Sequence, residues 1–326
     1  MPSTAKRKSK TQKPQKSVVQ KRKAIGITLA LFIGVLLAGE VIFFMKGQIN
    51  IPQDYPVQLT SSFKGDDQAC GPFAPWDIKA GPNWIALTDQ PRERILIFDG
   101  QGHFERQITS KEAGKPPFKE ISCLATDGQK TIYVMDTWNA LIRYFNVASG
   151  KPTGVLNLGP QSTFGPRGVA WDAGNFIVAD TGTHRVLKVS PSDQLLGNWN
   201  GAGGKKKLLN PIAAAVDAQG LVYVAHQNGL KVLDAQGKCV RDDESLPVND
   251  VALDTRGNAY AALRDSGTVK VFDPKGKYVG TLSVAGKKGQ YIQGVRALTV
   301  LPNGDLACVR GGEVDFYHPV PQAAAH

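Results

Sequence analysis

Few side chains in this sequence stand in patterns that carry out chemistry. The 326 residues contain no His-Glu-x-x-His metal motif, no nucleophilic serine elbow and no phosphate-binding glycine loop. None of the cysteines forms a Cys-x-x-Cys metal pair; they are Cys70, Cys123, Cys239 and Cys308. No catalytic residue is therefore predicted from local motifs, and any site has to be assembled from residues far apart in the chain.

The positive charge of the chain is concentrated at its N-terminus. The formal net charge is +11, and residues 1–23 contain nine basic residues and no acidic one. From residue 47 onward 29 Lys and Arg face 27 Asp and Glu, so the body of the chain carries only +2. A domain that binds nucleic acid needs a basic face of its own. We therefore expect no nucleic-acid partner.

Residues 24–45 form an apolar segment that contains one charge, Glu40. Its 22 residues are long enough to cross a bilayer as a helix. The basic residues before it predict a cytoplasmic N-terminus, with the rest of the chain in the periplasm or outside the cell. A cleaved signal peptide is the alternative. Residues 1–23 are predicted to be a disordered basic tail and residues 46–54 a linker.

The remainder of the chain is built from a repeat. The clearest unit, residues 166–190, reads as three short apolar strands separated by glycine- and aspartate-containing turns, and a fourth strand follows. The unit recurs at spacings of 46, 45, 45, 37 and 47 residues. Such a period with four strands per unit predicts a β-propeller, here an all-β fold with six blades. The first strands of the six copies are aligned at Asp77, Cys123, Gly168, Ala213, Asp250 and Ala297.

The two ends of the repeat region are predicted to pair with each other. The sixth copy stops at His318 after its third strand, and residues 55–64, YPVQLTSSFK, form a strand with no blade of their own. Pairing this strand with the last blade would remove an exposed edge. The propeller is therefore predicted to span residues 55–318, followed by a disordered tail at 319–326.

The third copy, with PRGVAWD followed by FIVADTGTHRV, resembles the NHL-repeat family. The first copy keeps the family's Asp and Arg as Asp89 and Arg94, and the second keeps Asp136 but has Leu141 at the Arg position. The resemblance implies a membrane-anchored member with a six-bladed fold, and it implies no single activity. At the Asp position the last three copies have His226, Leu263 and Arg310.

By this resemblance, the turn leading into each first strand and the hairpin between the second and third strands share one face, which is the usual binding face. Two aromatic residues, several arginines and polar groups there would suit a protein or glycan partner. His226 is a candidate ligand or base at the channel mouth, with drift of a degenerate copy as the alternative. The candidate residues are Trp76, Arg92, Trp138, Asn139, Arg167, His226, Asn249, Arg264 and Arg296.

Some six-bladed relatives are metalloenzymes, namely lactonase-like hydrolases and amidated-peptide lyases. By analogy with the first group, Asp77, Asn249 and Asp250 could offer oxygen ligands to calcium. Arg167 and Arg296 belong to the same ring and would oppose a divalent cation. The lyases use several histidines, and few are placed for that here. The sequence thus favours a membrane-anchored binding or scaffold propeller without a cofactor, with a calcium- or zinc-dependent enzyme as the alternative.

Cys70 and Cys123 are both predicted near this face, at the start of the first and second blades. In an oxidising compartment they could form a disulfide bond that closes this region. Reduced, buried thiols are the alternative.

Overall fold

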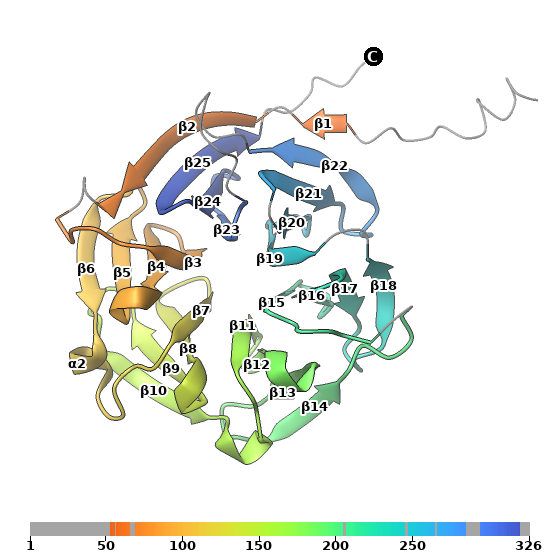
Figure 1. Ribbon diagram of the computed structural model, residues 1–326, viewed down its shortest axis with the longest axis horizontal. Helices are drawn as coiled ribbons and strands as arrows, with labels where there is room; N and C mark the ends of the chain where they lie inside the picture. The colour runs from red at the N-terminus through yellow and green to blue at the C-terminus, as the bar shows by residue number, and fades with distance from the viewer. Residues whose placement is uncertain are drawn as a thin grey trace, which may run out of the picture. The chain divides into compact units, whose positions relative to one another are not determined.

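The computed structural model describes residues 53–55, 57–65, 69–204, 207–244, 247–264, 266–284 and 294–319. Their strands form six antiparallel sheets of four strands, one of which gains a fifth strand. The sheets are arranged around a central axis, with β3, β7, β11, β15, β19 and β23 innermost (Figure 1). The predicted six-bladed all-β propeller is therefore confirmed.

We number the blades along the chain and give their strands from the axis outward. Blade 1 contains β3 (Pro75–Ala80), β4 (Trp84–Asp89), β5 (Arg94–Asp99) and β6 (Phe104–Ile108). Blade 2 contains β7 (Ile121–Thr126), β8 (Thr131–Asp136), β9 (Leu141–Asn146) and β10 (Pro152–Asn157). Blade 3 contains β11 (Pro166–Asp172), β12 (Asn175–Asp180), β13 (Arg185–Val189) and β14 (Leu195–Trp199).

The second half of the ring repeats this order. Blade 4 contains β15 (Ala213–Val216), β16 (Val222–His226), β17 (Gly229–Leu233) and β18 (Cys239–Asp243). Blade 5 contains β19 (Val248–Leu253), β20 (Ala259–Leu263), β21 (Thr268–Phe272) and β22 (Tyr278–Ser283). Blade 6 contains β23 (Ala297–Val300), β24 (Leu306–Arg310), β25 (Glu313–Pro319) and, from the other end of the chain, β2 (Val57–Lys64).

The ring closes as predicted, through pairing of β2 with β25. The antiparallel register runs from Val57 opposite Pro319 to Lys64 opposite Glu313. Phe63 of β2 is buried, and its ring centroid lies 4.9 Å from that of Phe98 in blade 1. Because Phe63 contacts both blade 6 and blade 1, the closing strand contributes to the core as well as to the backbone ladder.

The structure adds a strand that the sequence did not predict. β1 (Gln53–Tyr55) pairs in parallel with β22, on the outer edge of blade 5. The predicted strand 55–64 is therefore divided between two blades, with Pro56, which has no backbone N–H to donate, between the two parts. The last two residues of the predicted linker 46–54 belong to β1, and Pro319, which was predicted to begin the C-terminal tail, belongs to β25.

The core lies between neighbouring blades. Every residue of β4, β16 and β20 is buried, because the second strand of each blade is covered on both faces by the adjacent sheets. Aromatic contacts link blades directly, as where the ring of Tyr133 in blade 2 stacks on Trp171 in blade 3 at 4.7 Å between centroids.

Ion pairs brace the hairpin between the second and third strands. In blades 1 and 3, Arg94 Nε lies 2.7 Å from Asp89 Oδ2 and Arg185 Nε lies 3.0 Å from Asp180 Oδ2. These carboxylates are fully buried. The guanidinium groups also donate to backbone carbonyls of the preceding loop, which fixes that loop on the hairpin.

Blades 2 and 6 keep this brace in altered forms. In blade 2, where Leu141 stands at the Arg position, Arg143 supplies the cation, with its Nε 2.8 Å from Asp136 Oδ2. In blade 6 the polarity is reversed, because Arg310 stands at the Asp position and donates to Asp315 Oδ2 at 3.0 Å. Blade 6 has therefore lost the sequence pattern of the repeat but keeps the ion pair, with the acidic and basic residues in exchanged positions.

The predicted membrane segment at residues 24–45 lies outside the described residues, as do the predicted tails at 1–23 and 320–326. Among the residues that are described, no helix is long and apolar enough to cross a bilayer. The anchor stays a prediction.

Candidate functional site

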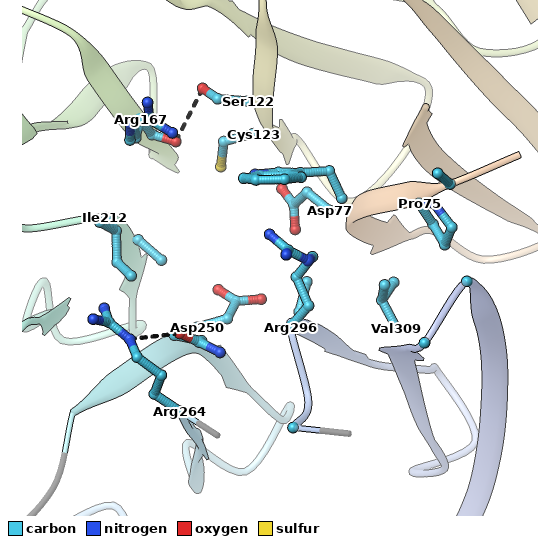
Figure 2. Close-up of a pocket in the computed structure, with 18 of the residues that line it drawn as sticks. Pro75, Asp77, Ser122, Cys123, Arg167, Ile212, Asp250, Arg264, Arg296 and Val309 are labelled. Atoms are coloured by element: carbon cyan, nitrogen blue, oxygen red, sulfur yellow. Dashed lines mark hydrogen bonds between the residues drawn. The ribbon is translucent and has the colours of Figure 1, made fainter. Parts of the chain in front are cut away.

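A cavity of about 850 Å³ opens at one end of the propeller axis. All six blades contribute to its wall, chiefly through the residues that begin the first strand of each blade. Figure 2 shows most of these residues around the cavity. The lining consists of Ala74, Pro75, Trp76, Asp77, Pro91, Ser122, Cys123, Arg167, Ile212, Ala213, Asn249, Asp250, Arg264, Gly294, Arg296, Ala297, Val309, Gly311 and Gly312.

The repeat explains why these residues converge. The first strands approach the axis in the same register, so residues at equivalent positions of different copies meet, although they are some 45 residues apart in the chain. Five of the predicted face residues line the cavity: Trp76, Arg167, Asn249, Arg264 and Arg296.

Three arginines from three blades supply the positive charge at the cavity. Arg167 Nη2 lies 3.1 Å from Glu120 Oε1, whereas Arg264 Nε donates to a neutral acceptor, Asn249 Oδ1, at 3.1 Å (Figure 2). The Cζ atom of Arg296 lies 3.7 Å from the ring centroid of Trp76, a stacked cation–π contact. Within the described residues, neither Arg264 nor Arg296 has a carboxylate partner.

This arrangement leaves two guanidinium groups facing a partly enclosed space. Burial lowers the pKa of Arg296, so its charge is incompletely solvated in the absence of a ligand. A guanidinium presents a planar set of donors that matches a carboxylate or phosphate. The cavity mouth is therefore suited to an anionic group.

Lys79 is the site residue that sequence reasoning missed. Its Nζ lies 3.2 Å from Asp77 Oδ1 on its own strand and 3.8 Å from Asp250 Oδ2 on blade 5. Its pKa is raised, because the two carboxylates outweigh the opposing effect of burial. Lys79 follows Asp77 by two residues, and residues i and i+2 of a strand share a face, so this spacing could have revealed it.

The carboxylates around Lys79 do not fit a calcium ion. Asp77 accepts hydrogen bonds from the backbone N–H groups of Ile78 and Leu124 as well as from Lys79. The third predicted ligand, Asn249, already accepts through Oδ1 from Arg264. Calcium takes six to eight oxygen ligands, and among the described residues no group of three or more His, Cys, Asp or Glu is placed to hold a metal. A lysine ammonium lies where the cation would be expected.

Asp77, Cys123 and Asp250 instead join neighbouring blades. They occupy the same position in blades 1, 2 and 5, and each accepts a hydrogen bond from a backbone N–H of the next blade. The distances are 2.6 Å from Leu124 N to Asp77 Oδ2, 3.5 Å from Val169 N to Cys123 Sγ and 2.9 Å from Leu298 N to Asp250 Oδ2.

The disulfide predicted between Cys70 and Cys123 is not formed, and all four cysteines are free. Cys123 is buried at the channel, where its sulfur contacts Val169 of blade 3. Cys70 packs against the Phe63 cluster between blades 6 and 1. The prediction was wrong because Cys70 lies in the loop before β3 and packs between blades 6 and 1, whereas Cys123 begins the first strand of blade 2 and lines the cavity.

Three other predicted face residues do not line the cavity. Arg92 donates to Asp89 at 3.3 Å, and Asn139 donates to Asp136 at 2.9 Å, so both add to the hairpin braces. Trp138 is exposed, and its indole N–H donates to Glu120 Oε2. Glu120, which sequence reasoning also missed, therefore contacts both Trp138 and the cavity residue Arg167.

His226 is not a channel ligand or base. It is fully buried at the end of β16, and its Nε2 has no hydrogen-bond partner within the described part of the chain. Burial, followed by the charge of Lys231, lowers the pKa of His226 to about 4, so the ring is neutral at pH 7. Lys231, five residues later, is fully buried and pairs with Asp242 and with Glu244 at 3.3 Å. The prediction that His226 lies on the binding face was wrong.

Comparison with known proteins shows the fold and no more. No protein-family model matches the sequence, and no curated protein matches it. Among 1186 matching chains of solved structures, one described as a streptogramin B lyase structure aligns with a TM-score of 0.57 and 12% identity. The alignment covers 80% of this chain and 97% of that one. At this identity the similarity shows a shared propeller fold, on which function depends on the individual site.

Proposed function

We propose that this protein is a non-catalytic binding propeller whose channel mouth holds an anionic group of a partner molecule. The partner is a protein or a glycan, and the propeller is anchored in a membrane by residues 24–45 as part of a larger envelope complex. The observation that carries the proposal is the convergence of Arg264 and Arg296, both without a carboxylate partner among the described residues, on one cavity beside Trp76.

Electrostatics at this mouth favours an anion over a metal ion. Arg264 and Arg296 would repel a divalent cation, and Lys79 already lies between Asp77 and Asp250 and offsets part of their negative charge. A metal-dependent lyase or lactonase is the second candidate, with support from the fold of the streptogramin B lyase structure alone.

The membrane topology in this proposal rests on the distribution of charge around residues 24–45. A periplasmic reporter enzyme fused after His326 should be active, and a reporter that works only in the cytoplasm should be inactive. The reverse pattern would place the propeller in the cytoplasm and overturn the proposed location.

Anion binding is tested by titrating the full chain, purified in a nonionic detergent, with hexaglutamate and with a galacturonate hexamer. We expect at least one of these ligands to bind with an affinity that falls as salt is raised, and hexalysine not to bind. Calorimetry measures the binding. The proposal would be overturned if neither anion binds. It would also be overturned if the purified protein holds stoichiometric calcium or zinc and chelation of that metal removes an enzymatic activity.

A further inference from the structure

Two exposed aromatic side chains lie beside the cavity. Trp138 is 48% exposed and Phe164 is 64% exposed, and their ring centroids are 6.4 Å apart. Trp138 belongs to the turn η3 (Thr137–Asn139) between β8 and β9, and Phe164 lies in the loop leading into β11. We name this pair the aromatic shelf. The other exposed large apolar residues in the described part of the chain lie toward the outer edge of the blades: Val155, Leu195, Leu196 and Val240.

Glu120 connects the aromatic shelf to the cavity. One of its carboxylate oxygens accepts from the indole N–H of Trp138, and the other lies 3.1 Å from the guanidinium of the cavity residue Arg167. The backbone of Glu120 is left-handed, with φ of 67°. A non-glycine residue in this conformation needs support from its surroundings. Cavity and shelf are thus linked by a single carboxylate that contacts both Trp138 and Arg167.

The neighbouring residue Thr137 adds to this rigidity. Its Oγ1 lies 2.7 Å from Ser122 Oγ and 2.9 Å from the carbonyl oxygen of Pro166. Ser122 lines the cavity, and Pro166 begins the strand that carries Arg167. The turn that carries Trp138 is therefore fixed against the strand that carries Arg167, and a rigid surface costs little entropy when a ligand binds.

The geometry of the shelf favours an aliphatic side chain over a sugar ring. The two rings meet edge to face at 74°, so they form an angled notch. A sugar stacks best on one flat aromatic face, whereas a branched aliphatic group can contact both rings of a notch. The arginines that line the cavity call for a negative charge elsewhere in the same ligand.

We infer that this rim binds an extended acidic segment of a partner protein, with a carboxylate side chain in the cavity and an aliphatic side chain on the aromatic shelf. The inference deepens the proposed function and rests on it. The complementary charges come from Arg264 and Arg296, which have no carboxylate partner within the described residues. The apolar contact comes from Trp138 and Phe164.

The test compares two capped peptides, Glu-Glu-Glu-Leu-Leu and Glu-Glu-Glu-Ser-Ser, binding to the full chain in detergent. The leucine peptide should bind about tenfold more tightly, because its apolar surface leaves water. Trp138→Ala and Phe164→Ala should each remove most of this preference and leave the affinity for the serine peptide unchanged. Trp138→Phe should retain most of the preference, because it keeps a ring at this position. Leu196→Ala, which removes an equally exposed apolar group on β14, should change neither affinity.

Equal affinities of the two peptides for the wild-type protein would overturn the inference while leaving anion binding intact. The inference would also fall if phosphatidylglycerol vesicles or the galacturonate hexamer depended on Trp138 and Phe164 more strongly than the leucine peptide does. If hexaglutamate, the galacturonate hexamer and the serine peptide all fail to bind, the proposed function itself is overturned. Near-ultraviolet circular dichroism of each variant distinguishes loss of the shelf from loss of the fold. If Trp138→Ala unfolds, the peptide preference of Phe164→Ala and of Trp138→Phe still tests the inference.

Discussion

Replacing Lys79 by methionine should lower the free energy of unfolding by about 3 kcal/mol at pH 7.5, the cost of breaking a buried ion pair by removing one partner. The side chain of Lys79 is only 17% exposed, and its ammonium lies between Asp77 and Asp250. Methionine has a similar length and no charge, so the variant would leave two buried carboxylates facing each other. Urea unfolding followed by tryptophan fluorescence measures the loss.

The loss should shrink as the pH falls. Burial, and then the charge of Asp77, raises the pKa of Asp250 above its usual range, while Lys79 opposes this rise. Without Lys79 the pKa of Asp250 in the folded protein must rise further, and the folded state then binds a proton where the unfolded chain has none. The deficit relative to the wild type is therefore full above this raised pKa and shrinks as the pH falls through it to about 6, the pKa of Asp250 when Lys79 is present.

Lys188→Met is the matched control. Lys188 Nζ lies 2.7 Å from Asp172 Oδ2, but this is a single pair, and its lysine is 24% exposed. Its loss should cost less than about 1 kcal/mol and depend little on pH over this range. A Lys79→Met variant as stable as the wild type at pH 7.5, or one whose deficit grows as the pH falls, would contradict the role assigned to Lys79.

Changing Arg264 and Arg296 together to glutamine should weaken hexaglutamate binding by about a hundredfold, with each single change costing about tenfold. These magnitudes follow from the loss of charged hydrogen bonds to a desolvated carboxylate. Glutamine retains a polar group of comparable reach, so the cavity keeps its shape and loses its charge. Calorimetric titration of the four proteins gives the two single effects and their coupling.

Arg256→Gln controls for the loss of net charge. Arg256 is 78% exposed and follows β19, at the opposite end of this strand from Asn249. Its neutralisation should leave the affinity for hexaglutamate within about twofold, because an exposed charge more than a Debye length away is screened. An effect of Arg256→Gln equal to that of the double variant would mean that binding depends on net charge rather than on the cavity.

The architecture could be predicted from the sequence because it rests on features that repeat. Six copies near a 45-residue period, each with strand-length apolar segments, specify the blades, and the unmatched strand before the first copy specifies the closure. The ring of first-strand residues followed from the same register, which is why Trp76, Asn249 and Arg296 were placed at the axis correctly.

Side-chain contacts that differ from one blade to another could not be predicted from the repeat. His226 occupies the position of a buried aspartate, and its character depends on Lys231, Asp242 and Glu244, of which the last two come from the outer side of the blade. Lys79 could have been found from strand alternation, but its second partner, Asp250, lies four blades farther along the chain. Such pairings depend on how far side chains of different blades reach into the space around the axis, and the repeat pattern does not encode that.

The disulfide prediction failed for a related reason. Cys70 and Cys123 are both near the start of a blade, but Cys123 points into the channel, whereas Cys70 contacts the closing aromatic cluster. Two residues near the start of different blades can lie toward one face and still have different neighbours, so predicting a disulfide also requires their positions relative to the axis.

Anion binding at the channel mouth is most directly observed through the arginine Nε–H resonances of the full chain, recorded by ¹H–¹⁵N NMR while hexaglutamate is added. Single Arg→Gln variants assign the signals of Arg264, Arg296 and Arg256. We expect saturable shifts of the Arg264 and Arg296 signals, with the Arg256 signal unchanged. Binding that shifts neither the Arg264 nor the Arg296 signal would contradict an anion site in the cavity.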